Sequence, residues 1–168
     1  MKMKSIAMIA LISMTMMGVT AEGTAKTGLM GSSDVEIHKV MTQFQKALQD
    51  KKKDDILGLF VNDDVPVTAS ASDKTLARVR EKKADAAKIL YSTSGKFATE
   101  IGTDKDSSEE RFSNIKIDSD GAVAAVSFDF VFLGDGKPLN IGKEAWLLVN
   151  TEKGWKISSI AYSMNFPN

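Results

Sequence analysis

The sequence contains no cysteine, and this absence removes several kinds of chemistry at once. A disulfide, a thiolate nucleophile and a cysteine-based metal site are all excluded. So is the attachment of a lipid to an N-terminal cysteine. Only one histidine, His38, is present, and a transition-metal site would need more ligands of this kind. We therefore expect neither a bound metal nor another cofactor.

Basic charge is not in excess either. The 22 Lys and Arg residues are balanced by 22 Asp and Glu residues, and no basic run is present that could contact phosphates. Glycine-rich phosphate loops and the G-x-S-x-G pattern of serine hydrolases are also missing from the sequence. The acidic groups at Asp63-Asp64 and Asp104–Asp106 lack the ligand spacing of a calcium loop, so we interpret them as solvated turns. Nucleic acid is not an expected partner.

No hydrophobic run is long enough to be a good membrane span. The most apolar run, Ile6–Val19, follows two lysines and precedes small residues at the positions that a signal peptidase reads. This three-part pattern is typical of a secretory signal peptide and favours it over an uncleaved anchor. We predict a signal peptide over residues 1–21, cleaved after Ala21, with Ala25 as the alternative. The mature chain is then expected to be periplasmic or secreted, with no stable membrane anchor.

Residues 22–33 are rich in Gly, Ser and Thr and are predicted to be a flexible leader, which leaves residues 34–168 as a single folded domain. The domain opens with a helix, because Ser33 and Glu36 fit a capping box. His38 lies beside the apolar stripe of this helix and is interpreted as a structural residue. The stripe follows helical spacing and consists of Ile37, Met41, Phe44 and Leu48.

A short second helix is predicted to end at Phe60, and a third, with a Lys- and Arg-rich exposed side, is predicted over Asp73–Tyr91. After Gly95 the apolar period changes to two. This change indicates a weak strand at 97–101 and, beyond a charged loop at 104–110, a run of further strands. These strands are predicted at 112–118, 122–133, 141–150 and 155–164. Helices followed by hairpins indicate an α+β fold with the helices on one face of an antiparallel sheet.

Three segments resemble one family. They are the short helix and turn DILGLFVNDDV at Asp55–Val65, the long aromatic strand after the Asp120-Gly121 turn, and KGWKISSI at Lys153–Ile160. Together they are similar to the NTF2-like superfamily (SnoaL-like, ketosteroid isomerase-like), in particular to its small exported bacterial members. The resemblance implies a cone, in which a strongly curved sheet wraps the helices around a pocket, and often a dimer through the sheet. The superfamily includes isomerases, dehydratases, epoxide hydrolases, polyketide cyclases and many proteins without known activity, so the fold alone assigns no chemistry.

The carboxylate of Asp129 is the most conspicuous candidate for chemistry, because it lies between Phe128 and Phe130 in a long apolar strand. A mechanism of the ketosteroid isomerase type needs a carboxylate base in an apolar pocket and an acid that stabilises an enolate oxygen. Tyr91 and Tyr162 are the candidates for that acid. Strand alternation offers a test of whether Asp129 points into the pocket.

Regular hairpins would place Asp129 opposite Trp146, and Glu144 opposite Val131. The phenylalanines of the long strand would then lie on the other face, which is the more apolar one and should line the pocket. We therefore favour an outward-pointing Asp129 over a pocket base, and the same holds for Glu144. A single bulge would reverse part of this assignment.

The outer face would also carry Trp146, Leu148 and Ile157. A tryptophan beside two aliphatic side chains on a surface is typical of an interface between subunits. We therefore expect a homodimer that forms through the sheet.

The leading functional hypothesis is a non-enzymatic domain that binds a small apolar or amphipathic molecule in its cone. An isomerase, dehydratase or cyclase that uses Asp129 with a tyrosine is the first alternative. An interaction module with a cone filled by its own side chains is the second. The predicted ligand-binding residues are aromatic, and they are Phe44, Phe60, Tyr91, Phe128, Phe130 and Tyr162.

Overall fold

The computed structural model describes residues 31–167. The predicted signal peptide and residues 22–30 of the predicted leader lie outside this range. The described chain folds into four helices and one six-stranded sheet, which confirms the predicted α+β class. Within this range, no helix combines the length and the apolar character needed to cross a membrane.

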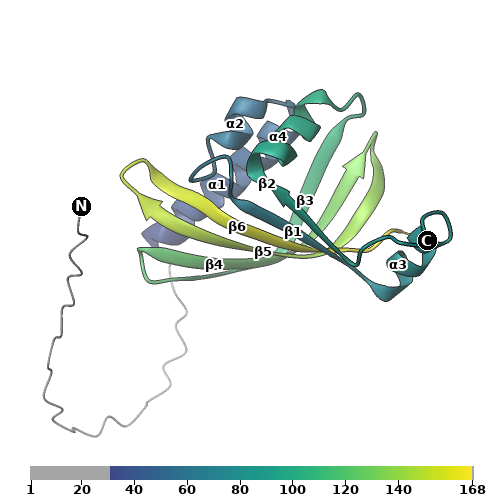
Figure 1. Ribbon diagram of the computed structural model, residues 1–168. Coiled ribbons are helices and arrows are strands. Elements are labelled where there is room, and N and C mark those ends of the chain that lie inside the picture. Colours follow the sequence, from purple (N-terminus) through teal and green to yellow (C-terminus); the bar gives the residue numbers. More distant parts are fainter. Residues whose placement is uncertain (1–30, 168) are drawn as a thin grey trace, which may run out of the picture.

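The sheet curves around three of the four helices, and the fourth lies apart from them at the other end of the sheet (Figure 1). The helices are α1 (Ser32–Gln49), α2 (Lys53–Leu57), α3 (Asp73–Arg80) and α4 (Ser94–Thr103). The strands are β1 (Pro66–Ala71), β2 (Ile89–Thr93), β3 (Ser108–Ser119), β4 (Val123–Gly134), β5 (Lys137–Thr151) and β6 (Gly154–Met164). Their order is β2-β1-β6-β5-β4-β3, and β1 runs parallel to β6 while every other neighbouring pair is antiparallel.

Helix α1 carries the apolar stripe that the sequence predicts. All four stripe residues are buried against the sheet. The predicted capping box is wrong, because the helix begins at Ser32 with Gly31 as its N-cap and no side chain caps it. Residues 32 and 33 therefore belong to the helix and not to the leader.

The segment between β1 and β3 differs most from the prediction. The predicted third helix ends at Arg80, and Tyr91 belongs to the edge strand β2. The predicted weak strand at 97–101 is instead the helix α4, which begins where the side chain of Thr93 accepts a hydrogen bond from the Lys96 amide. A short apolar run can fit both a period of two and the i, i+4 spacing of a helix, and here the run forms a helix that packs mainly against α2.

The main core lies inside the curve of the sheet and is rich in aromatic contacts. The indole ring of Trp146 lies 4.9 Å from the ring of Phe44 on α1 and 5.2 Å from the ring of Phe128 on β4. The Phe44 ring also stacks on Phe97 of α4 at 5.9 Å. These rings connect the inner face of the sheet to both helices.

The β4–β5 hairpin sets which side chains enter the core. Asp135 and Gly136 both have positive φ, 49° and 72°, so they form a two-residue turn of the type that favours Asp-Gly. The turn pairs Leu133 with Pro138, and a bulge at Leu139 then shifts the register by one residue, so that Asp129 lies opposite Lys143 and Phe128 opposite Glu144. The predicted partner of Asp129 was three residues further along β5, and an odd displacement exchanges the two faces of a strand.

The β5–β6 hairpin follows the predicted pairing from its turn as far as Leu148 and Ile157. A bulge then leaves Ser158 unpaired, so Trp146 faces Ile160 and not Ser159. Both hairpins together turn Glu144, Trp146 and Leu148 toward the inside of the cone.

Candidate functional site

A cavity of about 240 Å³ lies between the inner face of the sheet and the helices α1 and α4. Its walls are mainly aromatic, with aliphatic side chains completing them. The aromatic lining residues are Phe44, Phe97, Phe130, Phe132, Tyr162 and Phe166. The polar lining residues are Glu110, Asn140 and Glu144. This combination of an apolar wall with a few polar groups is typical of a site for a small molecule.

Two carboxyl groups meet in this wall. Glu110 comes from β3 and Glu144 from β5, and each residue is only 6% exposed. The two side chains share a hydrogen bond, and the indole N–H of Trp146 donates a second one to Oε1 of Glu144 at 2.5 Å. Carboxyl groups buried in an aromatic environment favour the neutral form, since the charged form loses its hydration.

Burial raises the pKa of both groups, but not equally. The pKa of Glu110 is raised well above its ordinary value by burial, and further by the neighbouring charge of Glu144 and by their hydrogen bond. Burial raises the pKa of Glu144 to about 7, while the hydrogen bonds from Trp146 and Glu110 oppose that rise. Glu110 is thus the carboxyl that keeps its proton and donates it in the shared hydrogen bond. Glu144 is the one that loses its proton near neutral pH.

Tyr162 adds a hydroxyl group to the same site. It lies on β6 directly opposite Glu144, and its ring meets Phe130 edge-on at 6.1 Å. Burial raises the pKa of the Tyr162 hydroxyl, and the charges of Glu144 and then Glu110 raise it further. A hydroxyl that stays protonated beside a carboxylate can donate a hydrogen bond to a bound molecule.

The mouth of the cavity is formed by two partly exposed lining residues, Leu139 and Phe166. Phe166 belongs to the C-terminal tail, which continues from β6 beside β5. The amide of Asn165 donates to Oδ1 of Asn140 at 2.7 Å, and the amide of Phe166 donates to Oγ1 of Thr75 on α3 at 3.0 Å. The helix α3 does not line the cavity, yet it fixes the tail that forms one side of its mouth.

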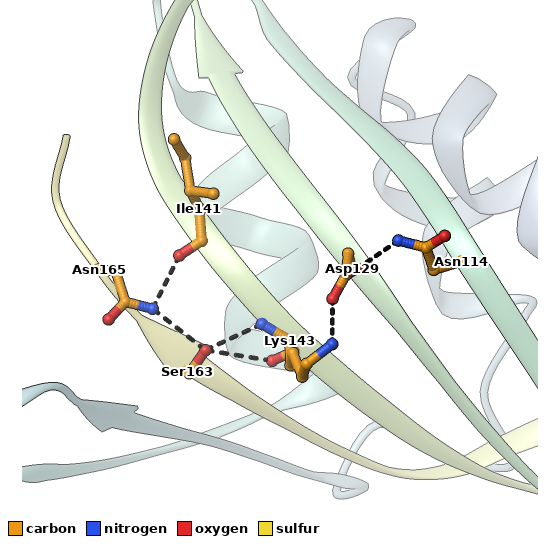
Figure 2. A network of polar contacts seen from close by, with 6 residues as sticks. All are labelled: Asn114, Asp129, Ile141, Lys143, Ser163 and Asn165. Atoms are coloured by element: carbon orange, nitrogen blue, oxygen red, sulfur yellow. Dashed lines mark hydrogen bonds and ion pairs between the residues drawn. The ribbon is translucent and has the colours of Figure 1, made fainter.

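Asp129 lies on the outer face of the sheet, as the alternation argument favoured (Figure 2). Its carboxylate forms an ion pair with Lys143, its cross-strand neighbour, and accepts a hydrogen bond from the Asn114 amide at 2.6 Å. These two partners lower the pKa of Asp129, Lys143 more than Asn114. An ionised, partly exposed carboxylate outside the cavity is poorly placed as a pocket base, and neither Tyr91 nor Tyr162 is among its partners.

The predicted ligand-binding residues divide into three groups. Phe44, Phe130 and Tyr162 line the cavity. Phe60 and Phe128 are buried in the core but do not line the cavity, and Tyr91 is 79% exposed on the edge strand β2. The prediction for Tyr91 rested on a helix that the chain does not form.

The predicted interface residues Trp146, Leu148 and Ile157 are core residues, each at most 1% exposed. Placing them on the outer face was wrong, because the real hairpin registers turn them inward. They have no surface left for a partner subunit. The outer face instead carries small side chains, the Asp129–Lys143 ion pair and the half-exposed Ile141 and Leu147.

Sequence reasoning missed the carboxyl pair. Glu144 was interpreted as an outward residue, and the Asp135-Gly136 turn alone would also have placed it outside, because the bulge at Leu139 is what turns it inward. Glu110 was assigned to a charged loop, but β3 begins at Ser108. Counting back from Phe112 in steps of two gives the signal that was available, since Ser108 and Glu110 share its face.

The remaining polar groups give no support to a metal centre. In the chain from residue 31 to 167, no cluster of three or more His, Asp or Glu side chains could hold a metal ion. His38 lies on α1, and its Nδ1 is 2.8 Å from the backbone oxygen of Asp34. This local contact fits the structural role expected for it.

No family model matches the chain, and no curated protein sequence matches it. Solved structures do match. An NTF2-like protein from Cytophaga hutchinsonii has a TM-score of 0.58 at 14% identity, over 81% of this chain and 100% of the other. An NTF2-like protein with a cystatin-like fold from Novosphingobium aromaticivorans has a TM-score of 0.57 at 12% identity, over 79% and 81%. A proposed scytalone dehydratase from the same organism has a TM-score of 0.56 at 17% identity, over 79% and 83%. At these identities the similarity shows the fold.

Proposed function

Because the chain has the NTF2-like cone fold, we propose that it binds a small, mainly apolar molecule in the cavity, with a polar group of that molecule against Glu110 and Glu144. The observation that carries the proposal is the cavity itself. The cone keeps about 240 Å³ of space between aromatic walls, whereas a pure interaction module would fill its cone with its own side chains. The volume suits a molecule smaller than a typical drug.

The free-energy cost of burying the two carboxyl groups supports a role for them in ligand binding. Each buried carboxyl destabilises the fold when it ionises, and two apolar side chains of similar volume would avoid this penalty. Groups that are costly for the fold and open to a cavity are candidates for function. The pair therefore gives the bound molecule a defined orientation in an otherwise apolar space.

The test is native mass spectrometry of the protein purified from its own host, which detects a retained ligand. Met164→Trp should fill the cavity near its mouth and abolish retention. Val123→Trp adds the same bulk at an exposed position of β4 and should leave retention intact. A wild-type protein without a retained molecule, and without a thermal shift in the presence of small cyclic ketones or phenols, would contradict the proposal.

A second candidate function is acid–base catalysis of the isomerase or dehydratase class, and the pKa of Glu144 favours it. A group that titrates at about 7 can take up and release a proton at neutral pH. Glu144 would be the base, and the hydroxyl of Tyr162 would stabilise a developing oxyanion. These residues replace Asp129 and Tyr91 of the sequence-based alternative.

Exchange of carbon-bound protons for deuterium in a small cyclic ketone, followed by NMR in D₂O, tests this chemistry without knowledge of the natural substrate. Glu144→Gln should abolish enzyme-dependent exchange, and Tyr162→Phe should reduce it about 100-fold. Asp129→Asn should leave it unchanged. Equal exchange in Glu144→Gln and the wild type would remove the catalytic candidate while leaving ligand binding intact.

Export is proposed on the sequence pattern of residues 1–21 alone. We expect N-terminal sequencing of protein from a bacterial periplasm to begin at residue 22, or at residue 26 if the alternative site is used. A mature protein that still begins with Met1 would contradict export.

A further inference from the structure

The ionisable side chains that line the cavity are all acidic. Among the described residues that line it, two carry carboxyl groups and none carries a positive charge. The partners of Glu144 are an indole N–H and the neighbouring carboxyl of Glu110, and both are neutral donors. A bound molecule that brought a positive charge would supply the missing counter-charge.

The same holds for every element packed around the pair. Helix α1 contributes Phe44 and the neutral Gln45, whose amide donates to the backbone oxygen of Glu110 at 2.8 Å. Strands β5 and β6 contribute Trp146 and Tyr162. Strand β4, between the two carboxyl-bearing strands, contributes aromatic side chains opposite both of them. Glu100 of α4, whose charge also raises the pKa of Tyr162, is acidic too.

The walls around the carboxyl pair favour the same kind of ligand. Six aromatic rings line the cavity, and the negative face of an aromatic ring attracts a cation within about 6 Å of its centre. Tyr162 and Phe130 meet edge-on beside Glu144, so their rings lie at right angles around one corner of the cavity. An aromatic corner next to a carboxylate is the arrangement that binds an alkylated ammonium group.

We propose that the cavity selects a small organic cation, in which an alkyl-substituted ammonium group lies against Glu144 and the aromatic corner. This inference rests on the proposed binding function and names the ligand class for it. A soft ammonium group with apolar substituents loses little hydration on entering such a cavity, unlike a bare Lys-type ammonium. The apolar remainder of the molecule would fill the rest of the aromatic space.

The pH dependence of binding follows from which carboxyl ionises. Above pH 7 Glu144 carries a negative charge while Glu110 stays protonated, because burial raises the pKa of Glu110 further. Affinity for an ammonium ligand should therefore rise about tenfold from pH 6 to pH 8, as the ionised fraction of Glu144 rises. A neutral ligand of the same shape gains nothing from this charge.

The experiment compares choline with its neutral carbon isostere, 3,3-dimethylbutan-1-ol, by isothermal titration calorimetry or NMR titration at pH 6 and pH 8. We expect choline to bind more tightly at pH 8 and the isostere to bind with little change. Glu144→Gln should weaken choline binding at pH 8 about tenfold without affecting the isostere. Asp129→Asn is the matched control, because it removes a carboxylate from the outer face and leaves the cavity and the charge of Glu144 in place.

The outcomes separate this inference from the function on which it rests. Binding of the isostere without a preference for choline at pH 8 would overturn the cation inference and leave the apolar binding site standing. Equal choline binding by wild type and Glu144→Gln would also overturn it. Binding of neither probe, together with the absence of a retained ligand, would overturn both proposals. Circular dichroism of each variant verifies that it is folded.

Discussion

The buried carboxyl of Glu144 makes a direct prediction about stability. Its pKa is about 7 in the folded chain and 4.5 for an ordinary glutamate, so the folded state binds its proton more tightly than the unfolded state. The stabilisation from this proton is complete below about pH 4.5 and is lost as the pH rises to about 7. Integrated from pH 5 to pH 8, the loss is about 2–3 kcal/mol of the free energy of unfolding.

Glu144→Gln should remove this dependence, because glutamine keeps the shape and can still accept the indole hydrogen bond but does not titrate. Groups that do not interact with Glu144 titrate alike in both proteins, so they cancel in the difference between wild type and variant. The difference should change by about 2–3 kcal/mol in favour of the variant from pH 5 to pH 8. The carboxylates with lowered pKa values, including Asp129, titrate below this window.

Urea denaturation at several pH values, followed by tryptophan fluorescence, measures this difference, since Trp146 and Trp155 are both buried and report unfolding. Glu152→Gln, at an exposed position in the turn between β5 and β6, is the control and should run parallel to the wild type. A constant difference between wild type and Glu144→Gln from pH 5 to pH 8 would refute the reasoning. It would mean that the Glu144 carboxyl is hydrated in the folded chain.

Three further predictions concern positions outside the carboxyl pair. A Cβ atom at Gly142 would lie 2.8 Å from the backbone oxygen of Ser163. Gly142→Ala should therefore lower the free energy of unfolding by about 1–3 kcal/mol in a urea titration. An unchanged midpoint would contradict this close approach. Thr75→Val removes the acceptor of the Phe166 amide and should speed hydrogen exchange of that amide, while exchange in the β4–β5 ladder stays unchanged. Equal protection of the Phe166 amide in variant and wild type would show that α3 does not hold the tail. Leu147→Asp should convert a homodimer formed through the outer face into a monomer in light scattering, and a dimer that persists would place the interface elsewhere.

The sequence predicted the layers of this fold well because hydrophobic periodicity reports burial directly. The stripe of α1 and the strands from Phe112 onward were found, although β3 and β5 each begin four residues before the predicted start. The third helix was extended too far because its exposed charged residues fit a helix as well as a loop. The weak strand at 97–101 was wrong because five residues cannot distinguish the two periods.

The candidate site depended on a finer quantity, the register between strands. Which side chains are buried, and which rings touch, depends on the face of the sheet that each residue occupies. A register shift by an odd number of residues moves a side chain to the other face, and an even shift does not. The turn at Asp135-Gly136 was readable in the sequence, but the inward position of Glu144 also depends on the bulge at Leu139. Neither this bulge nor the one at Ser158 could have been predicted, because nothing in the two side chains distinguishes them from regular strand residues.

The mouth of the cavity contains one residue that the sheet does not use. Leu133 pairs with Pro138 and Phe132 pairs with Asn140, so Leu139 is the extra residue of a bulge and takes no part in the ladder. Gly134 makes room for it, since a Cβ there would lie 2.5 Å from the Leu139 Cδ1 atom. A substitution at Leu139 therefore changes the mouth of the cavity without removing a residue from the ladder and without altering the carboxyl pair.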